Sequence, residues 1–299
     1  MTAPPRPVAR PDRGIRAARR LDPREAGFQG LLLLSFGLGV VVLAVLLIQV
    51  IVQGWPRLNL DLFRRFPSSL PSRAGAQSAI FGTLWVIGFT ALFTVPLGVA
   101  AGIYLEEYAD KQRWYNRLVE LNIQNLAAVP SIIYGILGLG FIVRGPLKFG
   151  FVVISASLTL TLLILPTVIL ASREAIRAVP MSIRLASLAL GATKWQTVSR
   201  QVLPSAVPGI ATGIILALSR AIGEAAPLVL LGGLTFITFN PTGAFSPFTV
   251  MPIQIFNYIE RPQSEYRVVA AAMIVVLLAI LLLMNSVAIW LRNRFRQEW

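Results

Sequence analysis

The most informative segment of the sequence begins Ala171-Ser-Arg-Glu-Ala-Ile-Arg-Ala-Val-Pro180 and continues past Gly191 to Pro227. Its first part is polar and charged. Its last part is an apolar run that carries Arg220 and Glu224 near its middle. A structured polar loop between two apolar runs is typical of a surface that another protein binds. Opposite charges inside an apolar run are typical of a polar pathway.

The composition is that of an integral membrane protein. The 299 residues are 56% hydrophobic and only 13% charged, with a mean hydropathy of +0.71, whereas soluble domains contain about 25% charged residues. The chain has no Cys and no His, which excludes disulfides, Cys/His zinc sites and His-based catalysis, so we expect no metal site and no catalytic residues. The net charge of +14 is explained by membrane orientation, and no nucleic acid partner is expected.

Six apolar runs are long enough to cross the membrane, since ~20 residues span the ~30 Å hydrocarbon layer. Pro96 and Pro166 lie inside these runs, where neighbouring helices can satisfy the freed backbone groups. The spacings Gly98–Gly102 and Gly209–Gly213 predict close helix contacts. The expected spans are 30–52, 78–105, 123–143, 150–172, 207–232 and 267–291.

The distribution of Lys and Arg predicts that both termini are cytoplasmic. With the amino terminus inside, the inner segments hold 18 Lys and Arg and the outer segments hold 8, as the positive-inside rule requires. The expected organisation is a disordered basic tail (1–27), a first span with its outer loop (28–77), a core of five spans (78–291) and a cytoplasmic tail (292–299).

The outer connection from Gly233 to Tyr266 contains a second feature. Residues Met251–Ile259 predict a short interfacial helix at the outer mouth. Two explanations of this helix stay open: packing at the membrane surface, and docking of an external partner.

The loop at 173–206, the coupling loop, predicts two short amphipathic helices separated by Gly191. Gly191 supplies the backbone break, and Pro204 and Pro208 are expected to stop the second helix and begin the next span. The chain contains no Gly-x4-Gly-Lys-Ser/Thr phosphate loop. Energy for transport would therefore come from an ion gradient or from another polypeptide.

The coupling loop resembles the EAA loop of binding-protein-dependent ABC importer permeases, in which a Gly precedes Ile/Val-x-Leu-Pro by about ten residues. Leu185 stands where that family usually has Glu, and Gln201 where it usually has Ile or Val. The resemblance implies an all-α fold of six transmembrane helices, the MetI-like type I importer fold. The residues expected to couple to the ATPase are Arg184, Ala186, Ala189, Gly191, Lys194, Trp195, Leu203 and Pro204.

Three other segments are similar to phosphate importer permeases of the PstA type: Ala128–Gly135, Ser219–Pro227 and Met251–Asn257. This resemblance implies a subunit of the bacterial inner membrane that binds no cofactor and is not itself an enzyme. Its implied partners are a homologous PstC-type permease, a dimer of ATP-binding subunits, an external phosphate-binding protein and membrane lipid.

Four charged residues are candidates for the substrate pathway. Arg220 and Glu224 are four residues apart and would share one face of a continuous helix, as a substrate gate or as a structural pair. Arginine matches phosphate oxygens in a bidentate manner. Arg173 and Arg177 would lie on the phosphate exit route, or serve only as positive-inside anchors.

Two other functions stay open. The first is a permease for sulfate, molybdate or another solute, because a fold does not determine its substrate. The second is an ion-coupled secondary transporter, which predicts half-helices in inverted repeats.

Overall fold

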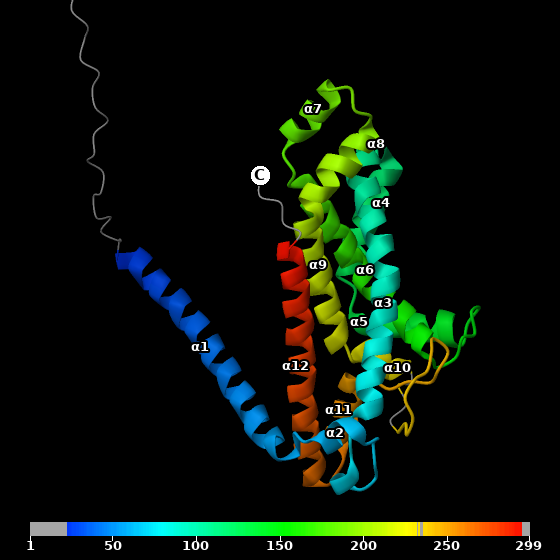
Figure 1. Ribbon diagram of the computed structural model, residues 1–299. Helices are drawn as coiled ribbons and strands as arrows, with labels where there is room; N and C mark the ends of the chain where they lie inside the picture. The colour runs from blue at the N-terminus through cyan, green and yellow to red at the C-terminus, as the bar shows by residue number, and fades with distance from the viewer. Residues whose placement is uncertain (1–22, 232, 234–235, 295–299) are drawn as a thin grey trace, which may run out of the picture. The chain divides into compact units, whose positions relative to one another are not determined.

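The computed structural model describes residues 23–231, 233 and 236–294, and all regular structure in these residues is helical (Figure 1). The chain forms two units, one ending at Gln49 and the other beginning at Val50. The first unit contains the amino-terminal part of α1 (Pro23–Gly54), which covers the span expected at 30–52. The two expected tails lie largely outside the described residues.

Four long helices build the second unit: α3 (Gln77–Ile103), α6 (Val153–Arg177), α9 (Leu203–Gly223) and α12 (Ser264–Arg294). Helix α6 is the most enclosed of them, because α3 and α9 both pack along it. Pro96 and Pro166 lie inside α3 and α6, as expected. Helices α3, α6 and α12 confirm the spans expected at 78–105, 150–172 and 267–291.

The small residues expected to bring helices together do so. A Cβ atom on Gly102 of α3 would lie 2.8 Å from the Cβ of Ser172 in α6, and one on Gly213 of α9 would lie 2.3 Å from the Cβ of Ala171. Such close approach is possible only without a side chain, and it increases the packing contact between helices in a membrane. The contacts expected at Gly98–Gly102 and Gly209–Gly213 are confirmed.

The third expected span, at 123–143, is wrong as a single straight helix. The chain instead forms α4 (Trp114–Ala127), then α5 (Ser131–Leu137) with a π turn, η4 (Gly138–Val143), and it bends by 106° between α4 and α5. Pro130 lies at the bend, where it removes a backbone donor and disfavours helical geometry in the residue before it.

The fifth expected span, 207–232, is wrong at both ends. Helix α8 (Lys194–Thr197) continues through a π turn, η5 (Val198–Val202), directly into α9, so Pro204 does not stop the helix. Helix α9 then ends at Gly223, and a separate short helix, α10 (Ala226–Leu230), follows.

Several short elements of the second unit pack around the start of α3. The helix expected at Met251–Ile259 is present as α11 (Met251–Glu260), which packs against α12 and α3. Tyr258 is fully buried and donates a hydrogen bond to the Gly75 carbonyl at 3.0 Å. This burial favours the packing explanation for α11. The remaining short elements are η1 (Trp55–Arg57), α2 (Leu60–Arg64) and η2 (Pro71–Arg73).

Candidate functional site

The coupling loop forms the helix–glycine–helix hairpin that the sequence predicts. Helix α7 (Met181–Ala189) ends before Gly191, whose φ of +81° lies in the left-handed region that favours glycine. Thr193 caps α8: its hydroxyl accepts from the Gln196 amide, and the Gln196 side chain accepts from the Thr193 amide. The Ser187 and Thr197 hydroxyls, 2.9 Å apart, join the two arms.

Exposed apolar side chains cover the outer side of this hairpin. Leu185 and Leu188 of α7 and Trp195 of α8 are exposed, and Leu190 at the turn is 90% exposed. A groove of about 480 Å³ lies between the arms. An exposed hydrophobic patch on a polar loop is typical of a protein-binding surface. The groove is lined by Ile183, Ala186, Ser187, Leu190, Ala192, Gln196, Arg200 and Gln201.

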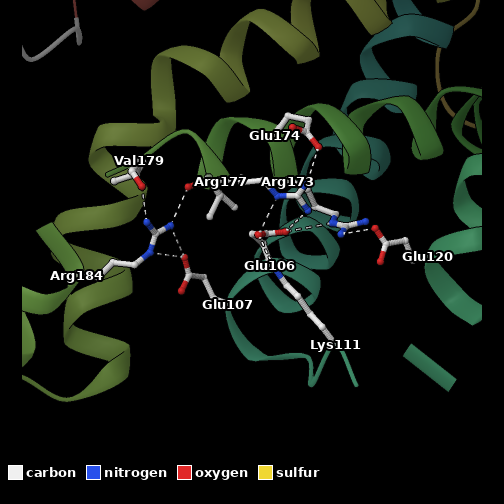
Figure 2. A network of polar contacts seen from close by, with 10 residues as sticks. Glu106, Glu107, Lys111, Glu120, Arg173, Glu174, Arg177, Val179 and Arg184 are labelled. Atoms are coloured by element: carbon white, nitrogen blue, oxygen red, sulfur yellow. Dashed lines mark hydrogen bonds and ion pairs between the residues drawn. The ribbon is translucent and has the colours of Figure 1, made fainter. Parts of the chain in front are cut away.

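Beneath the hairpin lies a network of acidic and basic side chains, drawn in Figure 2. Its centre is Glu106, which belongs to a π turn, η3 (Tyr104–Tyr108), that continues α3. The Glu106 carboxylate forms ion pairs with Lys111 at 2.8 Å and with Arg177 at 2.9 Å. Arg173 lies 3.6 Å from Glu106, and its other end pairs with Glu120 of α4 at 2.8 Å.

Arg173 is therefore held between two carboxylates, and only 4% of its side chain is exposed. The charge of this buried arginine is paired, as a buried charge requires, but among the described residues its Nε donates no hydrogen bond, because the nearest Glu106 oxygen is 3.6 Å away. Arg177 is half exposed and also pairs with Glu174 on its own helix at 3.1 Å. The two candidate pathway arginines thus lie side by side, but both contact acids of the same chain.

A second ion pair joins the coupling loop to η3. Arg184 of α7 contacts Glu107 at 2.9 Å, and it also donates to the carbonyls of Ile176 and Val179 at the end of α6 (Figure 2). Lys194 of α8 lies over the ring of Tyr108, 5.0 Å from its centre.

The expected pair of Arg220 and Glu224 is not formed. Arg220 lies in the last turn of α9, while Glu224 lies just beyond it in extended geometry (φ −82°, ψ 107°), so the two no longer share a helical face. Among the described residues, no ion pair joins them. The correction follows from the helix end at Gly223. Arg220 is about 25 Å from Leu203 along α9, given a rise of 1.5 Å per residue, and its side chain is exposed.

The other expected coupling residues lie on α7, on α8 and at the start of α9, and their role in coupling stays a prediction. Ala186 and Ala189 lie on α7, Trp195 on α8, and Leu203 and Pro204 at the start of α9.

Sequence reasoning missed the acids Glu106, Glu107 and Glu120. A signal was present: the Glu106-Glu107 pair directly follows one apolar run, and Arg173 and Arg177 end another whose terminus is expected on the same side.

Long apolar helices and a helix–glycine–helix hairpin are features of a membrane transport subunit. The chain matches the family described as binding-protein-dependent transport system inner membrane component over residues 95–297, and it belongs to that family. In this family the permease forms the membrane channel, and separate subunits hydrolyse ATP.

Similar proteins include several importer permeases. A probable ABC transporter permease, YqgI of Bacillus subtilis, is 34% identical over 72% of this chain and 76% of its own length. The phosphate transport system permease PstA 1 of Mycobacterium tuberculosis is 33% identical over 77% of this chain and 75% of its own. PstA of Haemophilus influenzae is 31% identical over 81% and 84%.

Solved structures agree on the fold. A chain of a bacterial alginate ABC transporter superposes with a TM-score of 0.66 at 17% identity, covering 89% of this chain and 93% of that one. A chain of the MetNI methionine ABC transporter gives 0.58 at 18% identity, covering 74% and 96%. The all-α importer permease fold implied by the sequence is thus confirmed.

Proposed function

We propose that this chain is a transmembrane permease subunit of an ATP-driven, binding-protein-dependent importer of inorganic phosphate. The observation that carries the proposal is the similarity to PstA permeases at 31–33% identity over at least three quarters of the chain. The second support is Arg220, a permanently charged side chain whose planar fork suits phosphate oxygens.

The exposure of Arg220 supports a role for its side chain in contacting the transported anion. A charged side chain inside the hydrocarbon layer is costly unless it is paired or reaches water. Arg220 is exposed at the surface of the chain and forms no ion pair among the described residues. We infer that it faces a wet pathway between this chain and a second permease. Glu224, at the end of the same helix, disfavours tight binding of an anion there and so assists release.

The proposed assembly pairs this chain with a homologous PstC-type permease. Two ATP-binding subunits dock on the coupling loops, and an external binding protein delivers phosphate. Both termini are cytoplasmic and the membrane is the bacterial inner membrane, in line with the distribution of Lys and Arg. Arg173 and Arg177 take part in the pathway only if their carboxylate partners release them.

The experiment is uptake into proteoliposomes that contain the complete complex and its binding protein. Labelled phosphate is compared with labelled sulfate, and ATP hydrolysis is followed by ADP release, because phosphate is the transported solute. We expect ATP-dependent uptake of phosphate but not of sulfate. Uptake of sulfate with no uptake of phosphate would show that the permease carries another oxyanion.

A variant tests the role of Arg220. Arg220→Gln is expected to lower phosphate uptake roughly tenfold or more, since a hydrogen bond to a charged group contributes about 1.5–3 kcal/mol. Arg144→Gln, at an exposed arginine over the ring of Phe151, is the matched control and should transport normally. Normal uptake by Arg220→Gln at equal membrane levels would remove Arg220 from the pathway.

Of the other two functions, a permease for another small solute keeps the same fold and differs only in the uptake experiment. The ion-coupled secondary transporter loses its support, because the family to which the chain belongs uses separate ATPase subunits.

A further inference from the structure

Three consecutive residues of η3 contact cationic side chains from three successive elements. Glu106 pairs with Arg173 and Arg177 of α6, Glu107 pairs with Arg184 of α7, and the Tyr108 ring lies under Lys194 of α8. The end of α3 therefore contacts three elements of the coupling region, although about 70 residues or more of chain separate them in sequence.

The contact at Glu107 is more than a surface ion pair. The side chains of Arg184 and Glu107 are only 15% and 11% exposed, so water screens their attraction weakly. Arg184 also holds the carbonyls of Ile176 and Val179. One guanidinium thus fixes α7 to the end of α6 and to the end of α3 at once.

The turn itself is rigidly anchored. The Ala109 amide donates to the Tyr104 carbonyl at 2.8 Å, the i to i+5 bond of a π turn. Leu105 is buried and belongs to an apolar cluster with Ile123 of α4 and Ile169 of α6. Towards the amino terminus, η3 continues α3 without a break, so that Gln77–Tyr108 is one continuous helix.

We propose that η3 transmits movement of the coupling loop into α3, and that Glu107 is the positioning residue for this step, acting through Arg184. The inference rests on the proposed function, because it assumes that an ATPase moves the loop. It adds a second route for that movement. The first route runs along the chain through α8, η5 and α9; the second runs across space from α7 into α3. Both helices that pack on α6 then move together.

The first experiment measures whether the loop and α3 move as one body. The chain has no Cys, so spin labels can be attached at Ser182→Cys on α7 and Leu97→Cys on α3, both at exposed positions. The distance between labels is measured in the complete complex with and without a non-hydrolysable ATP analogue. We expect an unchanged distance in the native background. A distance that changes there on nucleotide binding would overturn the proposal.

The second experiment removes the ion pair. Glu107→Gln keeps the shape of the side chain and leaves the two carbonyl contacts of Arg184 in place. It should make the label distance depend on nucleotide and lower the solute moved per ATP about 2- to 30-fold, the range for changes within a coupling network. The control is Glu174→Gln, which removes another arginine contact in the same network (3.1 Å, 68% exposed) and should change neither quantity.

The outcomes separate this inference from the phosphate assignment. The distance measurement needs no solute, so it can fail while phosphate uptake is normal, or succeed while another anion is transported. If Glu107→Gln does not assemble, Glu107→Asp keeps the charge but shortens the reach, and should show the same dependence to a smaller degree. A native distance and native transport per ATP in Glu107→Gln would overturn the proposal.

Discussion

Glu106 offers the sharpest test of what stabilises the cytoplasmic end of α3. Its carboxylate is only 7% exposed, and it contacts Lys111, Arg177 and Arg173 at 2.8, 2.9 and 3.6 Å. Glu106→Gln removes the negative charge from beneath three cations. Breaking a buried ion pair by removing one partner costs about 3–5 kcal/mol.

The structure places the expected cost at the lower end of that range. Lys111 and Arg177 are 59% and 47% exposed and can turn to water, and Arg173 keeps its contact to Glu120 at 2.8 Å. We therefore expect a loss of about 3 kcal/mol in the free energy of unfolding, which for a chain of 299 residues corresponds to a fall of roughly 5 °C in the unfolding midpoint.

The assay is thermal unfolding of the purified chain in detergent, followed by tryptophan fluorescence. Glu174→Gln is the matched control, since Glu174 is 68% exposed and exposed pairs contribute about 0–1 kcal/mol. If Glu106→Gln lowers the midpoint no more than Glu174→Gln does, the network does not stabilise this end of the molecule. A double variant with Arg173→Met should lose less than the sum of the single variants, because the two sites contact each other.

Three further predictions concern glycines and a tyrosine. Gly82→Ala should destabilise the chain by about 1–3 kcal/mol or more, because its Cβ would lie 1.9 Å from the Thr249 carbonyl oxygen. Gly88→Ala in the same helix has open space around it and should stabilise the chain by about 0.5–1 kcal/mol. Thermal unfolding in detergent measures both variants, and equal shifts of the unfolding midpoint would contradict the prediction. Gly191→Ala should weaken co-purification with the ATPase subunit while Gly191→Asn does so less, since φ is +81° and Asn tolerates that geometry better; equal retention in both would contradict this. Burial raises the pKa of Tyr258, so the tyrosine loses its proton in the unfolded state first, near pH 10. The stability of the chain is therefore expected to fall as pH rises above that value. If the unfolding midpoint falls with pH as steeply in Tyr258→Phe as in the native chain, other groups are responsible.

The spans were predictable to the extent that their signals are local. The run in α6 is apolar and continuous, and its helix contains Pro166 without breaking, as expected. Pro130 has the same chemistry, yet the chain bends there by 106°. Hydropathy cannot separate the two cases, because the outcome depends on whether neighbouring helices compensate for the missing donor.

Arg220 and Glu224 show in the same way that a local sequence pattern does not determine where a helix ends. The spacing of Arg220 and Glu224 predicts a shared face only if the helix continues through both, and it ends at Gly223. The coupling loop was predictable because Gly191 and the capping residue Thr193 act on their own neighbours in sequence.

The sequence alone is enough to recognise a membrane protein with long apolar helices, a helix–glycine–helix loop and no Gly-x4-Gly-Lys-Ser/Thr phosphate loop. Apolar length, charge content and a missing motif need no partner to be recognised. Which charges meet depends on how the helices pack. Glu106 and Glu107 reach Arg177 and Arg184 across more than 70 residues of chain. Such contacts arise because close packing of α3 on α6 brings their ends together, and no local pattern records it.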